Sequence, residues 1–473
     1  MTLTLPENQD IIIVGATGDL ARRKLLPALY NLYLERLLPE RGRIIGFART
    51  SMDDNEFRTR AKNAVREFSR TGLDEQAWPA FAKRLMFVCA EPDGFAELLR
   101  RCEHPNRLVY LSTPPSTFSS TTRALGEHDL VQGTRLIVEK PLGHDVASAE
   151  ALDATLHEFF DESQIFRIDH YLGKETVQNI LIFRFGNSLF ERAWNRDAID
   201  HMQITVAESI GIEGRGTFYE EVGALRDIIQ NHVFQVLSLL TMEPPSSFKP
   251  EAIRDEKVKL FHAIQPLDPA KVVRGQYSSG RIEGAAVPGY RDEDGVKQGS
   301  TTETFAALQL SIDNWRWAGV PIFLRTGKRL PRRVTEILIS FRDVPIRFFE
   351  DTGVAHLPAN HLSIAIQPDE EITFAFLAKV PGPEIAVKAV RMHFSYGDSF
   401  MSQPAEAYER LLHDAMEGDH TLFARGDGVE RAWQIVQPVL DAMPPVCFYP
   451  GGSWGPEEAD MLMAPRRWHL HTR

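Results

Sequence analysis

Five short apolar runs in the first third of the chain alternate with stretches of helical periodicity, and this alternation constrains the fold more than any other feature. The runs are IIIV from position 11, RIIGFA from 43, LMFVCA from 85, RLVYLS from 107 and RLIVEKP from 135. Strands that alternate with helices predict βαβ units, in which parallel strands share one sheet and the helices cover its faces. We therefore expect an open parallel sheet in this part of the chain.

The pattern changes after about residue 200, where strand-like segments follow one another across short turns. The segments are HMQITVAE, TFAALQLSI, TEILISF, HLSIAIQ, EITFAF and IAVKAVRMH. Such a succession predicts a large, mostly antiparallel sheet. A chain of 473 residues exceeds what one hydrophobic core supports, so two domains are expected. We place an α/β domain over residues 1–166 and a larger α+β domain over residues 167–473.

Charge and composition exclude several classes of function. The net charge of −12 provides no basic field for nucleic acid, so an anionic ligand must be bound by a local cluster of cations. No segment approaches the roughly 18 uninterrupted apolar residues of a membrane span, and the N-terminus lacks an export signal. The three cysteines are too scattered for a disulfide framework or a zinc site. We expect a cytoplasmic protein without nucleic-acid or membrane partners.

A glycine turn joins the first apolar run to the first helical stretch, in the segment IIIVGATGDLARRKLLPALYNL. Gly15 and Gly18 form a Gly-x-x-Gly pattern, shorter than the G-x-G-x-x-G of many dinucleotide-binding proteins. Backbone amides at such a helix start can bind a pyrophosphate. The alternative is a turn that only connects a strand to a helix.

The end of the second apolar run, RIIGFARTS, bears on which dinucleotide binds. An NAD enzyme is expected to place an acidic residue there for the ribose hydroxyl, but this chain has Arg49, followed by Thr50 and Ser51. A guanidinium suits a 2′-phosphate, so we favour NADP over NAD. The alternative is an arginine that is merely exposed at the end of a strand.

Lysine, arginine and histidine side chains recur in short clusters. Lys140 follows the apolar run LIVE and is expected at the carboxyl end of the parallel sheet, where open α/β folds bind ligands. In RIDHYLGKE, His170 and Lys174 would share one face if the segment were helical. Lys328 and Arg333 lie far along the chain in LRTGKRLPRR. These cations could clamp an anion, or they could be solvated surface charges.

Two titratable residues interrupt the apolar face of a predicted helix over residues 218–242. Asp227 and His232 lie five residues apart, which on an α-helix separates their directions by about 140°. Asp227 is therefore not expected to orient His232, and Asp169 is the better candidate for that carboxylate. The alternative for His232 is a structural histidine of the core.

Long motifs in a fixed order resemble the glucose-6-phosphate 1-dehydrogenase family. RIDHYLGKE resembles its substrate-site signature, and the other motifs, which extend the match over residues 15–456, are GATGDLARRK, YLSTPP, EKPLG, NSLFERAWN, IDHMQITVAE, RDIIQNH, IDNWRWAGVPIFLRTGKRL and GSWGP. The resemblance implies a Rossmann-like NADP-binding domain followed by a domain for substrate binding and oligomerisation, which forms a homodimer or homotetramer. It also implies the first step of the oxidative pentose phosphate pathway.

That step is the oxidation of glucose 6-phosphate at C1 to 6-phosphoglucono-1,5-lactone, with NADP as hydride acceptor and NAD as a weaker alternative. By family likeness, His232 is the general base and Asp169 the carboxylate that orients it. The substrate-binding residues that the resemblance implies are Lys140, His170, Tyr171, Lys174, Glu208, Asp227, Lys328, Arg333 and Gln367. The implied cofactor-binding residues are Gly15, Thr17, Gly18, Asp19, Leu20, Arg49, Pro114 and Lys140. No metal is required, because the nicotinamide receives the hydride.

The chain departs from the family pattern at one substrate position, and a second class of function stays open. Many bacterial members carry a lysine where this chain has Arg333, so the contact with the ligand can differ in geometry. A non-catalytic sensor of sugar phosphates or dinucleotides could use the same fold. Such a sensor could lose His232 or Asp169, but both are present, which favours the enzyme.

Overall fold

The chain divides into two compact units, each of which contains its own sheet. The structure is a computed structural model that describes residues 5–346, 359–400 and 405–470. The first unit comprises Met1–Lys174, Pro245–Val258 and Pro404–Glu430, and the second comprises Glu175–Pro244, Lys259–Gln403 and Arg431–Arg473.

The first unit is built on a seven-stranded sheet in the order β17-β6-β5-β4-β1-β2-β3. All neighbouring strands are parallel except β17, which is antiparallel to β6. Each of the five apolar runs forms one strand, because a strand buried on both faces requires a continuous apolar stretch. The strands are β1 (Asp10–Val14), β2 (Ile44–Ala48), β3 (Leu85–Cys89), β4 (Arg107–Leu111), β5 (Thr134–Val138), β6 (Ile165–Ile168) and β17 (Phe423–Ala424).

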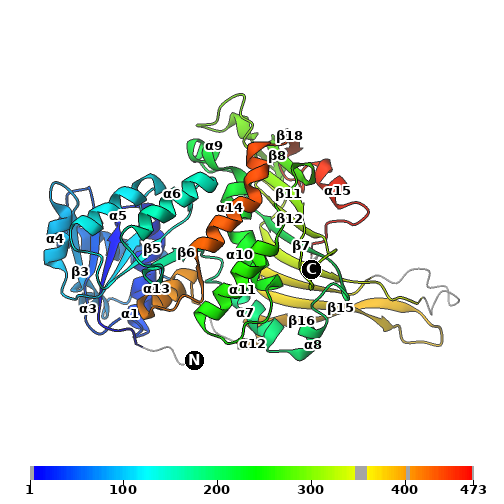
Figure 1. The fold of residues 1–473 in the computed structure, drawn as a ribbon, viewed down its shortest axis with the longest axis horizontal. Helices are drawn as coiled ribbons and strands as arrows, with labels where there is room; N and C mark the ends of the chain where they lie inside the picture. The colour runs from blue at the N-terminus through cyan, green and yellow to red at the C-terminus, as the bar shows by residue number, and fades with distance from the viewer. Residues whose placement is uncertain (1–4, 347–358, 401–404, 471–473) are drawn as a thin grey trace. The chain divides into compact units, whose positions relative to one another are not determined.

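Helices cover both faces of this sheet, as Figure 1 shows. The core on one face contains apolar residues of α4, α5 and α6, while α1 packs against α2 and α13. The helical elements of the unit are η1 (Ala21–Leu25), α1 (Leu26–Leu34), α2 (Asp54–Phe68), α3 (Trp78–Ala82), α4 (Gly94–Arg101), η2 (Pro115–Thr117), α5 (Phe118–Glu127), α6 (Val146–His157), η3 (Glu162–Gln164) and α13 (Ala407–Glu417). The predicted α/β fold of this part of the chain is confirmed.

Two segments from later in the sequence, Pro245–Val258 and Pro404–Glu430, complete the first unit. The second of them contains α13 and β17. On α13, the buried Glu409 accepts hydrogen bonds from Asn31 Nδ2 at 2.7 Å and from Arg70 Nη2 at 2.8 Å. The ring of His420 stacks on Phe166 of β6, with ring centroids 3.9 Å apart. The segment Pro245–Val258 contains the start of α11 (Pro250–Ala263). Sequence reasoning did not anticipate either return.

The second unit is built on a nine-stranded sheet in the order β16-β15-β14-β13-β7-β12-β11-β8-β18. Neighbours are antiparallel except for the pairs β7/β12 and β8/β18, which confirms the predicted mostly antiparallel sheet. The strands are β7 (Ile199–Ala207), β8 (Val272–Ser278), β11 (Phe305–Leu310), β12 (Ile322–Gly327), β13 (Val334–Phe341), β14 (His361–Gln367), β15 (Glu371–Lys379), β16 (Val387–Ser395) and β18 (Val446–Pro450), with β9 (Gly280–Ile282) and β10 (Ala285–Val287) forming a separate hairpin.

The remaining elements of the second unit are helical, and one of them corrects the sequence prediction. The predicted helix over 218–242 is three elements, α9 (Gly216–Ala224), η4 (Leu225–Val233) and α10 (Phe234–Thr241). Gly223, with φ 69° and ψ 171°, breaks the first from the second, and η4 is a π-helix. The other helical elements are α7 (Glu175–Phe185), α8 (Ser188–Arg192), η5 (Pro269–Lys271), η6 (Tyr290–Asp292), α12 (Tyr396–Phe400), α14 (Gly426–Asp441), whose first turn belongs to the first unit, and α15 (Glu457–Met463).

Candidate active site

The glycine turn follows β1 at the carboxyl edge of the parallel sheet. Gly15 has φ +87°, and a Cβ there would lie 2.7 Å from the carbonyl oxygen of Ser112. Gly18 N donates to Gly15 O at 2.9 Å, and the helical run starts at the next residue. The turn therefore presents backbone amides at a helix start, and Gly15 has no side chain that would cover them. Backbone amides in this position can bind a pyrophosphate.

The other predicted cofactor residues of this turn occupy the same edge. Thr17 and Leu20 are half-buried, whereas Asp19 is exposed and lies 3.8 Å from Arg23. Pro114 is exposed just before η2, after β4, which pairs with β1 so that Val14 lies opposite Leu111. Parallel pairing thus brings the ends of β1 and β4 together.

Arg49 lies directly after β2, the other neighbour of β1. Its side chain is exposed, and its guanidinium forms no hydrogen bond or ion pair with another described residue. The nearby candidates are all paired, since Arg22 contacts Glu67 at 2.5 Å and Lys24 contacts Glu406 at 3.1 Å. Arg49 therefore has donors available for an anion, and its contact with a 2′-phosphate stays a prediction.

Lys140 follows β5 and is half-buried beside a carboxyl group that sequence reasoning missed. Glu139 Oε1 accepts hydrogen bonds from Tyr110 at 2.7 Å and from Tyr408 at 3.1 Å. Burial raises the pKa of Glu139, while these hydrogen bonds and the charge of Lys140 oppose the rise. Tyr408 lies on the returning helix α13, so no local pattern in the sequence indicates it.

The segment RIDHYLGKE joins the end of β6 to the start of α7. Its central residues form turns rather than the helix on which the shared face of His170 and Lys174 depended. Asp169 Oδ1 accepts from Tyr171 N at 3.0 Å, and Lys174 N donates to Tyr171 O at 3.1 Å. The turns still gather the predicted residues, because Lys174 Nζ lies 4.4 Å from the centre of the Tyr171 ring. The His170 ring lies 5.2 Å from the same ring.

Asp169 is buried within the first unit together with a lysine that sequence reasoning missed. Lys257, on α11, is 3% exposed. Burial lowers the pKa of Lys257 to about 8, and the charge of Asp169 opposes that fall. The segment RDEKVKLF around Lys257 is rich in charge and resembles a solvated helix face, so its sequence did not indicate a buried lysine.

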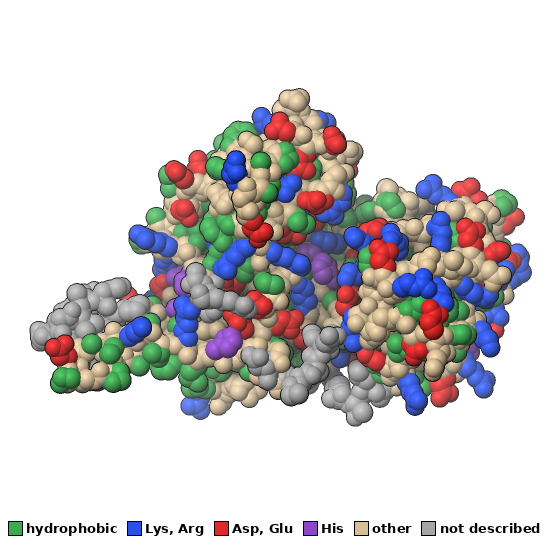
Figure 2. All heavy atoms as spheres, turned by 180° about the vertical axis from the view of Figure 1, so that it is seen from behind, with side chains coloured by type: hydrophobic (Ala, Val, Ile, Leu, Met, Phe, Trp, Pro, Cys, Tyr) green, Lys and Arg blue, Asp and Glu red, His purple; other side chains and the backbone are tan. Residues whose placement is uncertain are grey.

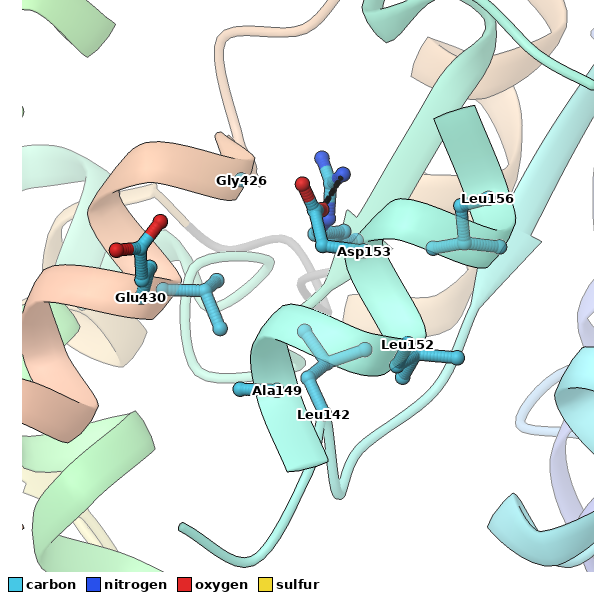
Figure 3. A pocket seen from close by; sticks show the side chains of 9 residues that line it. Leu142, Ala149, Leu152, Asp153, Leu156, Gly426 and Glu430 are labelled. Atoms are coloured by element: carbon cyan, nitrogen blue, oxygen red, sulfur yellow. Dashed lines mark hydrogen bonds and ion pairs between the residues drawn. The ribbon is translucent and has the colours of Figure 1, made fainter. Parts of the chain in front are cut away.

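The first residue of the RIDHYLGKE segment has a structural role. Arg167 is buried and pairs with Asp153 at 2.5 Å and with Glu162 at 2.7 Å. A pocket of about 10 Å³ beside this pair is lined mainly by α6 and the start of α14, and Figure 3 shows Asp153 and Glu430 at its rim. That volume holds about one water molecule, so the pocket is too small for a nucleotide or a sugar.

In the second unit, Glu208 and Lys328 follow the parallel neighbours β7 and β12. The pairing of Ala207 with Gly327 places both residues at the same edge of the sheet. Lys328 Nζ contacts Glu208 Oε2 at 2.5 Å, and Lys328 is buried. A lysine and a carboxylate held in this way can bond to neighbouring hydroxyls of one sugar.

Asp227 and His232 lie on η4, and the helix type overturns the argument from their spacing. In a π-helix, hydrogen bonds join residues five apart, so residues at that spacing lie on the same face. Asp227 is half-buried and His232 is 1% exposed. The expected separation of about 140° holds only for an α-helix. Geometry alone therefore does not remove Asp227 as a partner of His232.

Arg333 and Gln367 meet across neighbouring strands. Arg333 Nη2 donates to Gln367 Oε1 at 3.1 Å, and Gln367 Nε2 donates to Thr335 Oγ1 at 2.8 Å. Arg333 is exposed, so its guanidinium retains donors for a ligand. The structure thus brings together two predicted substrate residues that lie 34 positions apart.

Comparison with protein families covers both units. Residues 12–179 match the model described as glucose-6-phosphate dehydrogenase, NAD binding domain, and residues 181–470 match its C-terminal domain. The chain belongs to the glucose-6-phosphate dehydrogenase family. This result confirms the resemblance inferred from the motifs.

Individual glucose-6-phosphate dehydrogenases match along nearly their whole length. The glucose-6-phosphate 1-dehydrogenase of Aggregatibacter actinomycetemcomitans is 46% identical, with 97% of this chain and 96% of that protein covered. A solved glucose-6-phosphate dehydrogenase in complex with its substrate glucose 6-phosphate is 37% identical, with a TM-score of 0.91 and full coverage of both chains. The enzyme of Mycobacterium avium is 39% identical, with a TM-score of 0.85 and 98% and 99% coverage.

Proposed function

We propose that this chain oxidises glucose 6-phosphate at C1 to 6-phosphoglucono-1,5-lactone with NADP as the hydride acceptor. The observation that carries the proposal is the match of the whole chain to a glucose-6-phosphate dehydrogenase solved with that substrate. The fold supports the proposal, because most of the proposed site residues lie at strand ends or on adjoining turns, and Asp227 and His232 lie on η4.

The residues of the first unit fit NADP. The turn at Gly15 leaves no room for a side chain, and Arg49 offers an exposed guanidinium without a partner among the described residues. When bound, NADP supplies the nicotinamide ring that accepts the hydride. Lys140, at the end of β5, would contact both coenzyme and sugar.

His232 acts in this proposal as the general base. It takes the proton of the C1 hydroxyl, and the electrons of that O–H bond form the carbonyl of the lactone while the hydrogen on C1 leaves as a hydride. Asp169 orients the imidazole and stabilises its protonated form. His170, Tyr171 and Lys174 hold the phosphate, and Glu208, Asp227, Lys328, Arg333 and Gln367 contact the sugar.

The direct experiment is to mix the purified protein with glucose 6-phosphate and NADP and to follow the absorbance of the reduced nicotinamide. Reduction that depends on both ligands supports the proposed enzyme. Binding of both ligands without reduction would instead indicate a sensor.

The expected setting of the enzyme is the cytoplasm, because the three cysteines are unpaired, as in a reducing compartment. Among the described residues, no helix has the length and apolar character needed to cross a membrane. Figure 2 shows acidic and basic side chains interspersed over the visible face, which does not favour a nucleic-acid partner. A homodimer or homotetramer remains part of the proposal.

Replacement of Arg49 by alanine is expected to raise the KM for NADP by roughly tenfold or more, because a hydrogen bond to a charged group contributes ~1.5–3 kcal/mol. The KM for NAD should change much less, since NAD lacks the 2′-phosphate. Catalytic efficiency with both coenzymes is measured for wild type, Arg49→Ala and Arg41→Ala, a control at an exposed arginine before the same strand. An unchanged preference for NADP in Arg49→Ala would assign the phosphate to another residue, with Arg22, Arg23 and Lys24 next.

Replacement of Lys174 by alanine tests whether His170, Tyr171 and Lys174, called the phosphate clamp below, hold the phosphate of the substrate. We expect kcat/KM for glucose 6-phosphate to fall by roughly tenfold or more, through a loss of ~1.5–3 kcal/mol. The weak activity expected with unphosphorylated glucose should barely change, so glucose serves as the internal control. Equal fractional losses with both sugars would show that Lys174 does not bind the phosphate.

A further inference from the structure

The start of η4 is held by a residue from a distant part of the second unit. Ala224 N donates to the backbone oxygen of Glu303 at 3.0 Å, and Leu225 N donates to Glu303 Oε1 at 3.1 Å. Ala224, the residue before η4, provides no side-chain cap of its own. Because the first N–H groups of a helix have no partner inside it, Glu303 takes the place of a capping residue.

Gly223 allows this contact. The chain passes over the Glu303 carboxylate at Gly223, where φ is +69°, and a Cβ at that position would lie 2.5 Å from Glu303 Oε1. A side chain there would push the carboxylate away from the helix start. The glycine and the glutamate therefore form one local arrangement.

A buried arginine fixes the carboxylate from its other side. Arg274, on β8, donates to Glu303 Oε2 from Nη2 at 2.7 Å and from Nε at 3.1 Å. Arg274 is itself held, because it donates to the carbonyl oxygens of Thr301 and Pro444, each at 2.8 Å. Both members of the pair are about 95% buried or more, so the carboxylate has little freedom to move.

The residue next to Glu303 holds a second part of the site. Thr304 O accepts from Lys328 N at 2.9 Å, and Tyr449 bridges the hydroxyl of Thr304 and the carbonyl of Lys328 at 3.1 Å and 2.7 Å. Two consecutive residues thus support η4 and the backbone of Lys328.

We propose that Glu303 is a positioning residue, which through its contacts with the first turn of η4 sets the orientation of Asp227 and His232. This inference rests on the proposed function, since the orientation matters for activity only if these side chains act on the sugar. Glu303 itself touches neither sugar nor coenzyme in this proposal.

Replacement of Glu303 by glutamine tests the inference, because it keeps the size of the side chain and removes the charge opposite Arg274. We expect kcat to fall by about tenfold to hundredfold, since a shift of about 1 Å in a catalytic group costs on the order of 10² in rate. The KM for NADP should stay within about twofold, because a lost transition-state interaction lowers kcat without weakening coenzyme binding.

The matched control is Glu293→Gln. Glu293 is a largely buried carboxylate of the same unit, which accepts from the Tyr277 hydroxyl at 2.5 Å and contacts Arg329 at 3.5 Å. Among the described residues it forms no hydrogen bond with η4. Loss of a buried charge alone would therefore affect both variants, whereas loss of positioning affects only Glu303→Gln.

Hydrogen exchange provides a readout that does not depend on activity. The amides of 224–228 should exchange faster in Glu303→Gln than in wild type or Glu293→Gln. If Glu303→Gln does not fold, the double variant Glu303→Leu with Arg274→Met replaces the ion pair by apolar side chains, which is often tolerated, and still removes the acceptor for Leu225.

The inference is overturned if Glu303→Gln matches Glu293→Gln in kcat, whether or not exchange changes. If the wild type does not oxidise glucose 6-phosphate, the proposed function has failed, and exchange at 224–228 alone decides whether Glu303 holds η4.

Discussion

Replacement of His232 by asparagine is expected to lower kcat by ~10²–10⁴, the range that general-base catalysis contributes. The KM for glucose 6-phosphate should change little, because the phosphate clamp lies on other residues. The measurement is steady-state kinetics with both substrates, together with glucose 6-phosphate binding by calorimetry. His232 is 1% exposed, so a loss of folding has to be separated from a loss of the base.

His201→Asn is the matched control for that separation. His201 is a second buried histidine of the same unit, and its Nδ1 lies 2.8 Å from Asp200 Oδ2. We expect this variant to retain most of the wild-type kcat. Wild-type turnover in His232→Asn would remove His232 as the base, and equal losses in both variants would indicate damage to the fold.

Replacement of Asp169 by asparagine is expected to lower kcat by roughly 10- to 100-fold, because a hydrogen bond to a charged group contributes ~1.5–3 kcal/mol. The imidazolium would lose the negative charge that stabilises it. Asp227→Asn should instead raise the KM for glucose 6-phosphate, since Asp227 is expected to accept a hydrogen bond from the sugar. Kinetics of the two variants side by side distinguish the roles.

The opposite pattern has a physical basis in the π-helix. Asp227 and His232 share one face of η4, so Asp227 could orient the imidazole. A fall in kcat for Asp227→Asn without a change in sugar affinity would show that Asp227 orients the imidazole. Asp169 would then be assigned to binding of the substrate. Thermal unfolding of Asp169→Asn should be measured in parallel, because the substitution also removes a charge that favours the protonated form of the buried Lys257.

Sequence reasoning predicted the sheets because their strands carry local signals. The run DIIIV is buried at all five positions of β1, and continuous apolar runs of this kind indicate parallel strands without any tertiary knowledge. Residues at strand ends, such as Arg49 after β2 and Lys140 after β5, were also placed at the ends of strands from the pattern alone. In these cases the local pattern of apolar and charged residues is enough to identify the strand and the residue that follows its end.

The features that escaped prediction depend on partners far along the chain. The π-helical form of η4 cannot be read from RDIIQNH, whose apolar spacing also suits an α-helix, and the start of η4 is capped by Glu303, 78 positions from Leu225. Glu139 and Lys257 were missed for the same reason, because a charged residue resembles a solvated one until a second segment covers it.

The return of α13 and β17 to the first unit has a consequence for biosynthesis. A ribosome releases the chain from its N-terminus, so the residues around α1 emerge long before Glu409, which bonds to Asn31 and Arg70. Buried apolar residues of α13, including Leu411, Leu412 and Met416, emerge equally late. Throughout most of its synthesis the nascent first unit therefore exposes an uncovered helix face, which is the kind of surface that chaperones bind and that favours aggregation.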